Sequence, residues 1–184
     1  MSIAENIARV RANIAAAARE AGRDPAEITL VGASKMNDAA ACREAIAAGI
    51  DALGENRVQE MTAKLAEHAY DGAPLYFIGH LQRNKVNKVV GHVDLIQSVG
   101  SLELLDEIER VAAARDLVQD ILLEVNIGRE EAKSGFAPEE VLAGAEAAAA
   151  RTHVRVQGPD DHPPCGCQSG GKSAVFSGSA GTLC

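Results

Sequence analysis

The sequence predicts an α/β fold with parallel strands. Short apolar runs typical of strands alternate with longer runs that have helical spacing, as parallel α/β architectures do. The 184 residues are 47% hydrophobic, which is enough apolar material for one core. The alternation continues to about residue 158 and then stops. We therefore expect one folded domain over residues 1–158, followed by a different segment over residues 159–184.

The first elements are a helix, a strand and a second helix. Residues 3–20 have one apolar stripe at helical spacing. Its members are Ile3, Ile7, Val10 and Ile14. Residues 28–33 predict the first strand, and residues 37–48 predict a helix that ends at Gly49, because glycine best tolerates a left-handed cap.

Five more strands and four more helices follow in alternation. The strands are expected at residues 52–54, 75–78, 93–96, 121–126 and 154–157. The helices are expected at residues 58–70, 82–90, 101–115 and 138–150. The pattern therefore predicts six strands in all.

Lys35 follows the first predicted strand directly after the run Gly-Ala-Ser. In an α/β barrel, side chains at the C-terminal ends of the strands converge on the mouth of the active site. A lysine amine that is partly desolvated there loses its proton more easily and can form a Schiff base with an aldehyde. The alternative is a solvated residue that opens a helix, and position alone favours that alternative.

Five further segments strengthen the interpretation of Lys35, because together with Ser34-Lys35 they occur in one order along the chain. They are Gly-Glu-Asn-Arg-Val-Gln-Glu at 54–60, Phe-Ile-Gly-His-Leu-Gln-Arg-Asn-Lys at 77–85, Asp-Leu-Ile-Gln-Ser-Val at 94–99, Val-Asn-Ile at 125–127 and Lys-Ser-Gly-Phe at 133–136. With these motifs the chain resembles the pyridoxal phosphate homeostasis protein family over about residues 1–158. Each motif is weak by itself, whereas the ordered set is specific.

The resemblance implies a fold, a cofactor and a role. The fold is a (β/α)8 TIM-type barrel related to the N-terminal domain of alanine racemase. Here it is truncated to about six strands, whereas a closed barrel needs eight and about 250 residues, or somewhat fewer in compact members. The cofactor is pyridoxal 5'-phosphate, bound as a Schiff base on Lys35. The role is intracellular vitamin B6 and amino-acid homeostasis rather than a known turnover reaction.

Four further residues are candidates for binding the cofactor. Asn56 could hydrogen-bond the cofactor ring, or it could cap the helix that starts near Arg57. His80 could line the mouth after the third strand, or it could be a structural histidine. Ser98 and Asn126 stand at the ends of the fourth and fifth strands, where the position is right but the residue types are unspecific.

The segment 159–184 lacks any period typical of a strand or a helix. Reading allowed codons for it one base out of register gives a continuation that begins Leu-Met-Thr-Ile, as family members continue. We infer a one-base insertion near the codon of Gly158 and expect a disordered tail. The family's later Ser-x-Gly-Met-Ser and Arg-x-Gly-Thr segments, which hold the cofactor phosphate and ring nitrogen, do not occur here, so we expect weaker cofactor binding.

Two motifs within this tail are interpreted as coincidences. Residues 166–173, including Lys172, match the phosphate-loop pattern, but the flanking sequence predicts neither the strand nor the helix that the loop needs. His162, Cys165 and Cys167 could bind zinc, but their spacing fits no common four-ligand site.

Composition narrows the class of protein further. The formal net charge is −8 and only 3% of residues are aromatic, which argues against a nucleic-acid partner. No stretch predicts a signal peptide or a membrane span, so we expect a cytoplasmic protein. Its expected partner is a small-molecule cofactor, and we expect a monomer if the reading frame is restored. Two alternatives stay open. The first is a racemase-like enzyme that uses pyridoxal phosphate, but such an enzyme needs a second base, and neither Tyr70 nor Tyr76 is placed to supply it. The second is a nonfunctional fragment with an open barrel edge.

Overall fold

A computed structural model describes residues 2–129 and 134–161. These residues fall into two compact parts, residues 2–76 and the residues from 77 onward. Predictions that concern Lys133, the phosphate-loop match at 166–173, Lys172, His162, Cys165 and Cys167 lie outside the described residues. The strand order within each part follows the order of the chain.

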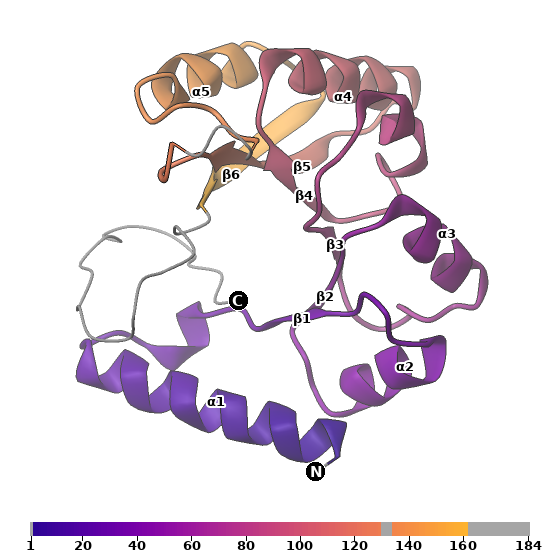
Figure 1. The fold of residues 1–184 in the computed structure, drawn as a ribbon, viewed down its shortest axis with the longest axis vertical. Coiled ribbons are helices and arrows are strands. Elements are labelled where there is room, and N and C mark those ends of the chain that lie inside the picture. Colours follow the sequence, from indigo (N-terminus) through magenta and orange to yellow (C-terminus); the bar gives the residue numbers. More distant parts are fainter. Residues whose placement is uncertain (1, 130–133, 162–184) are drawn as a thin grey trace. The chain divides into compact units, whose positions relative to one another are not determined.

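The first part alternates helices and short strands. Its elements are α1 (Ile3–Glu20), a 3-10 helix η1 (Pro25–Glu27), β1 (Val31–Ala33), α2 (Ala39–Ala47), β2 (Ala52–Glu55), α3 (Val58–Ala66) and β3 (Leu75–Phe77), which ends at the boundary (Figure 1). The caps explain where the helices begin. Ser2 and Glu5 form a capping box at α1, and the Asp38 side chain accepts from the Ala41 N–H at α2.

The first two strands of this part, β1 and β2, are parallel. Ala33 of β1 is paired with Gly54 of β2. The Leu53 N–H donates to the Pro74 carbonyl at 2.9 Å, which joins β2 to the residue before β3. Gly49 has φ +83° as it closes the turn after α2, which confirms the predicted role of glycine there.

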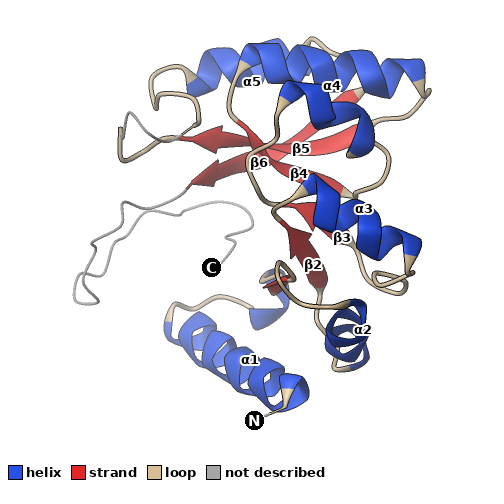
Figure 2. Cartoon of the chain, turned by 45° about the vertical axis from the view of Figure 1, so that its right-hand side comes forward, coloured by secondary structure: helices blue, strands red, loops and turns tan. Residues whose placement is uncertain are grey.

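The second part contains three parallel strands. Its elements are a 3-10 helix η2 (Arg83–Lys88), β4 (Leu95–Val99), α4 (Leu102–Ala114), β5 (Gln119–Val125), α5 (Val141–Ala149) and β6 (Val154–Asp161). β5 pairs with β4 on one side and with β6 on the other. α4 and α5 lie side by side over this sheet (Figure 2), and Ile96, Ile108 and Ile121 are fully buried between the layers.

Several predicted boundaries are wrong. The segment predicted as a helix over 82–90 is the 3-10 helix η2, and the helix predicted over 58–70 ends at Ala66. The strand predicted over 28–33 starts only at Val31, because Ile28 closes η1 and the Leu30 N–H donates to the Asp51 carboxylate instead of to a neighbouring strand. Val10, expected on the buried stripe of α1, is 37% exposed.

The last strand also differs from the prediction. The pattern predicts an end at residue 157, but β6 runs to Asp161, with Gly158 paired to Leu122 and Asp161 to Val125. β5 continues to Val125 and offers backbone partners as far as that residue, so the chain gains hydrogen bonds by staying extended. Pro159 has no N–H to donate, which a strand at the side of a sheet tolerates.

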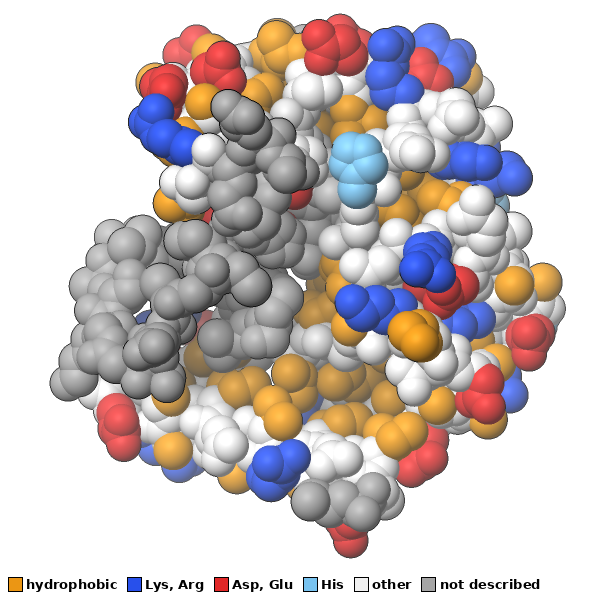
Figure 3. Space-filling model, viewed as in Figure 1, with side chains coloured by type: hydrophobic (Ala, Val, Ile, Leu, Met, Phe, Trp, Pro, Cys, Tyr) orange, Lys and Arg blue, Asp and Glu red, His pale blue; other side chains and the backbone are white. Residues whose placement is uncertain are grey.

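None of the helices in the described part of the chain is both long and apolar enough to cross a membrane. Positively and negatively charged side chains are interspersed on the face seen in Figure 3, with apolar side chains between them. Within residues 2–129 and 134–161, no three histidine, cysteine, aspartate or glutamate side chains are grouped as a metal site would require.

Candidate functional site

Lys35 and Asn56 follow two neighbouring parallel strands in the first part. Lys35 comes two residues after β1, and Asn56 comes directly after β2. Because β1 and β2 are parallel and Ala33 pairs with Gly54, both residues leave the same edge of the sheet. The predicted positions of both residues at strand ends are confirmed.

Ser98 and Asn126 occupy corresponding positions in the second part. Ser98 is buried near the end of β4, and Asn126 directly follows β5, which is parallel to β4. His80 lies three residues after β3 and is exposed to solvent. The structure therefore places each candidate at or near the C-terminal end of a strand, within its own part of the molecule.

Two of these candidates carry buried polar atoms without a partner. Among the described residues, only Asn56 Oδ1 and Ser98 Oγ are buried side-chain atoms that lack a hydrogen bond. The alternative role of Asn56 as a helix cap is not observed, because the cap residue of α3 is Arg57 and no side chain caps that end. An unpaired buried polar atom costs roughly 1 to 3 kcal/mol, so its presence calls for an explanation such as a ligand.

Lys35 stands in a tight turn. The Asn37 N–H donates to the Ser34 carbonyl at 3.1 Å and closes the turn around Lys35 and Met36. Met36 has φ +62°, which is uncommon for a residue with a side chain, and it is 89% exposed. The Lys35 side chain is also exposed, so the expectation of a partly desolvated amine is wrong here.

A buried polar network lies behind the Lys35 turn, and sequence reasoning missed it. Glu55 is fully buried at the end of β2 and forms an ion pair with Lys64 of α3. The Ser34 hydroxyl donates to Glu55 Oε1 at 2.8 Å, and the Tyr70 hydroxyl donates to the same oxygen at 3.1 Å. A signal was available, because Val58, Met61 and Lys64 are spaced as one face of a helix and the first two are apolar.

This network also bears on Tyr70 as a possible second base. Desolvation by burial, together with the neighbouring Glu55 carboxylate, raises the pKa of Tyr70. A phenol with a raised pKa keeps its proton and is a poor acceptor of another one. The structure thus gives no support to Tyr70 in two-base racemisation.

The segment Ser134-Gly135-Phe136 folds back against the end of β5. The Phe136 N–H donates to the Glu124 carbonyl at 2.8 Å, and the Asn126 N–H donates to the Phe136 carbonyl at 2.9 Å. The Ser134 hydroxyl contacts the buried Glu124 carboxylate at 3.0 Å. These bonds hold the backbone of Asn126 in place.

Gly135→Ala is expected to destabilise the protein by about 1 to 3 kcal/mol, since Gly135 has φ +120° and a Cβ there would lie 2.8 Å from the Asn126 nitrogen. Urea unfolding of the variant measures this loss. Gly49→Ala is a useful comparison, because Gly49 also has positive φ but a Cβ added to it would meet no atom within 4 Å. Equal losses in the two variants would show that the close approach to Asn126 is unimportant.

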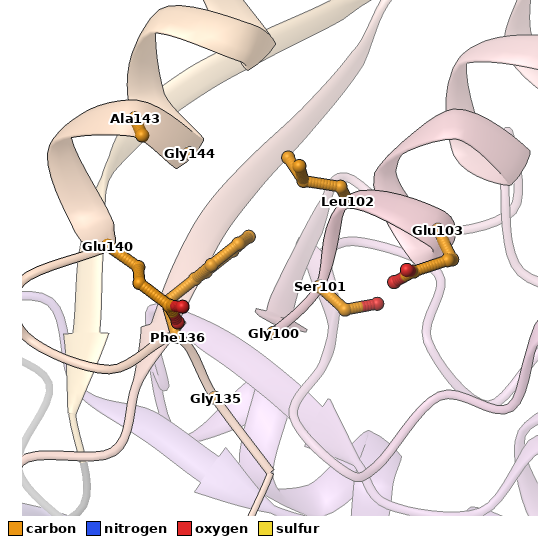
Figure 4. A pocket seen from close by; sticks show the side chains of 9 residues that line it. All are labelled: Gly100, Ser101, Leu102, Glu103, Gly135, Phe136, Glu140, Ala143 and Gly144. Carbon is orange, nitrogen blue, oxygen red and sulfur yellow. The ribbon is translucent and has the colours of Figure 1, made fainter.

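A pocket of about 350 Å³ lies in the second part, between the start of α4 and the start of α5 (Figure 4). Its lining includes Gly100, Phe136 and two carboxylates, Glu103 and Glu140. The size suits a small molecule. However, the lining contains no lysine or arginine, so it offers no charge complementarity to a phosphate, and it includes none of the five predicted site residues.

Alternating parallel strands and helices, with a lysine just beyond the first strand and asparagines just beyond two others, define an α/β protein of the barrel class. Comparison with known proteins gives the family. Residues 6–176 match the family described as alanine racemase, N-terminal domain. The chain is 41% identical over 157 residues to the pyridoxal phosphate homeostasis protein of Pseudomonas aeruginosa. The match covers 85% of this chain and 68% of that protein. It is 38% identical over 164 residues to the pyridoxal phosphate homeostasis protein of Aquifex aeolicus. That match covers 89% of this chain and 72% of the relative.

Solved structures agree. A protein of unknown function from Bifidobacterium adolescentis has a TM-score of 0.80 at 38% identity, over 86% of this chain and 68% of its own. PipY of Synechococcus elongatus, solved with PLP bound, has a TM-score of 0.75 at 32% identity, over 90% of this chain and 72% of its own. An alanine racemase from Clostridium difficile, at 16% identity and a TM-score of 0.64, shares the fold. The chain belongs to the pyridoxal phosphate homeostasis protein family, within the alanine racemase N-terminal-domain fold.

The match to the family reaches residue 176, beyond the boundary predicted at residue 158. The two bacterial relatives extend further than the matched region, since the matches cover 68% and 72% of their lengths. The origin of the 159–184 segment in a shifted reading frame stays a prediction.

Proposed function

We propose that this protein binds pyridoxal 5'-phosphate on Lys35 and takes part in the cellular homeostasis of that cofactor. The observation that carries the proposal is the position of Lys35, two residues beyond β1 at the sheet edge where Asn56, whose Oδ1 lacks a hydrogen bond, also stands. Relatives named pyridoxal phosphate homeostasis proteins and the PLP-bound structure of PipY support it.

The residues present fit such a group. Lys35 supplies a primary amine on an exposed side chain, which an aldehyde from solution can reach. Asn56 Oδ1 and Ser98 Oγ are buried and have hydrogen-bonding capacity left over. We assign Asn56 to a polar group of the cofactor; Ser98, Asn126 and His80 are further contacts that the family resemblance implies. When bound, the cofactor supplies an aldehyde that bonds to amines and a ring that withdraws electrons from the attached carbon.

The chain's own residues do three things in this account. The Ser34–Asn37 turn presents the Lys35 amine, the strand ends hold Asn56 and Ser98 rigidly, and the Glu124–Phe136 contacts fix the backbone of Asn126. We further propose that the protein works in the cytoplasm and that its frame-restored form is a monomer. Because the later phosphate-binding segments of the family do not occur in the sequence, we expect its affinity to be below that of full-length relatives.

The test of this function is a titration with pyridoxal 5'-phosphate, followed by visible absorption, of the wild-type chain and of Ser98→Ala. The variant should bind the cofactor up to about tenfold more weakly, because one hydrogen bond is worth about 0.5 to 1.5 kcal/mol. Its free energy of unfolding without cofactor should be unchanged or higher, because the substitution removes a buried atom that has no partner.

The matched control for this titration is Ser101→Ala. The Ser101 hydroxyl accepts from the Leu104 N–H at 3.2 Å and caps α4. Its loss should lower the free energy of unfolding by about 1 kcal/mol. The intrinsic affinity for the cofactor should not change. Undiminished affinity in Ser98→Ala would remove Ser98 from the site. A wild-type chain that shows no saturable binding would refute the proposed function.

A further inference from the structure

Two side chains of α3 hydrogen-bond to the main chain on either side of Lys35. Before Lys35, the Lys64 ammonium donates to the Ser34 carbonyl at 2.7 Å. After Lys35, the Met36 N–H donates to Glu60 Oε2 at 3.0 Å. Glu60 and Lys64 are four residues apart on one helix, so they lie on the same face. One face of α3 therefore contacts both peptide groups that flank the proposed cofactor lysine.

We propose that Glu60 and Lys64 are positioning residues that fix the direction in which Lys35 leaves the sheet. This inference rests on the proposed function, in which Lys35 carries the cofactor. Neither residue needs to contact the cofactor. Both act through the backbone of the Ser34–Asn37 turn.

The turn needs external support because its own contacts are few. Met36 is held at φ +62°, a backbone conformation that is strained for a residue with a side chain. Its side chain is 89% exposed and contributes little packing. The Asn37 N–H closes the turn on the Ser34 carbonyl, which also accepts from Lys64. Without the α3 contacts, the strained Met36 conformation would be held mainly by that backbone bond and by the Asn37 side chain, whose Nδ2 donates to the Lys35 carbonyl at 3.2 Å.

Lys64 is itself held in place from behind. Its ammonium pairs with Glu55, which is fully buried and also accepts from the hydroxyls of Ser34 and Tyr70. A charge-assisted bond inside a buried network is directional and strong. The Ser34 carbonyl is thereby connected to β2 as well as to α3.

Glu60 is suited to accept from a backbone amide. The Met36 N–H is the main cause that lowers the pKa of Glu60, with Arg57 and Lys64 contributing in the same direction. The Glu60 carboxylate therefore stays ionised at a somewhat lower pH than an ordinary glutamate does. An ionised acceptor makes a stronger bond to an N–H than a neutral one does.

The first test compares Glu60→Ala with Glu67→Ala, an exposed glutamate at the C-terminal cap of the same helix. Hydrogen exchange of the Met36 amide, followed by NMR, should become at least about tenfold faster in Glu60→Ala and stay unchanged in Glu67→Ala. The rate at which pyridoxal 5'-phosphate and borohydride label Lys35 should also fall about tenfold, because small misplacements of a reacting group slow its reaction strongly. Glu60→Gln keeps an oxygen acceptor and should recover part of both losses.

The second test addresses Lys64 with the double variant Glu55→Gln, Lys64→Met. This pair of substitutions keeps the side-chain volumes and removes both buried charges, so the fold is preserved while the donor to Ser34 is lost. Lys35 labelling should fall about tenfold here as well. Circular dichroism and the urea midpoint verify that each variant is folded.

These experiments distinguish the positioning role of Glu60 and Lys64 from the proposed binding of the cofactor on Lys35. Folded Glu60→Ala and double variants whose Met36 exchange and Lys35 labelling stay within twofold of wild type would overturn the inference. A wild-type chain that is never labelled at Lys35 would refute the proposed function. The exchange rate of the Met36 amide, which needs no cofactor, would then support or overturn the role of Glu60 on its own.

Discussion

Lys64→Met lowers the free energy of unfolding by about 3 to 5 kcal/mol, the largest stability change we expect from a single substitution in this chain. The reason is the fully buried carboxylate of Glu55, which would keep its hydrogen bonds from Ser34 and Tyr70 but lose its counter-charge. Since small domains are stable by only about 5 to 15 kcal/mol, this single substitution removes a substantial part of the total stability. Urea denaturation followed by circular dichroism measures the change.

The double variant Glu55→Gln, Lys64→Met is the control for this experiment. It removes both charges, so no unpaired carboxylate is left, and we expect it to regain most of the stability that the single substitution loses. Single and double variants of equal stability would show that the lost counter-charge is not the cause. A single variant within about 1 kcal/mol of wild type would contradict the buried pair itself.

Lys35→Ala is expected to abolish the covalent retention of pyridoxal 5'-phosphate. The proposed bond to the cofactor needs this one amine, and alanine cannot supply it. Because the Lys35 side chain is exposed, stability should change by no more than about 0.5 kcal/mol. The measurement is the near-ultraviolet absorption of the reduced pyridoxyl group that remains with the protein after borohydride reduction and desalting.

Lys88→Ala controls for nonspecific reaction of surface amines, since Lys88 is also exposed and lies at the end of η2. It should retain as much reduced cofactor as wild type. Substantial retention in Lys35→Ala would mean that another lysine reacts, and the assignment of Lys35 would have to be abandoned.

Much of the fold could be predicted from hydrophobic pattern because parallel strands are short apolar runs between amphipathic helices. The six strands all occur, and α1 spans the predicted residues 3–20. The pattern could not separate an α-helix from the 3-10 helix η2, since both bury apolar residues at similar spacing. It also could not find the end of β6, because residues 158–161 are extended by pairing with β5, a long-range effect that no local period reveals.

The positions of the candidate site residues could be predicted, but the buried residues that hold them in place could not. The places of Asn56 and Ser98 at the ends of strands are enough to propose them, and the structure adds that each carries a buried side-chain oxygen with no hydrogen-bond partner. The predicted environment of Lys35 is wrong, because a strand-end position does not determine how far neighbouring elements cover the side chain. Sequence reasoning missed Glu55 and Lys64 since charged residues are expected at the surface, and only their mutual pairing makes burial acceptable.

Peptide mapping of the full chain shows whether Lys35 carries the cofactor. The protein is incubated with pyridoxal 5'-phosphate, reduced with borohydride, digested with trypsin and analysed by mass spectrometry. Trypsin does not cleave after a modified lysine, so we predict one labelled peptide that spans residues 24–43 and remains uncut at Lys35. A label spread over the other lysines, or concentrated on one of them while Lys35 is cleaved normally, would contradict the claim.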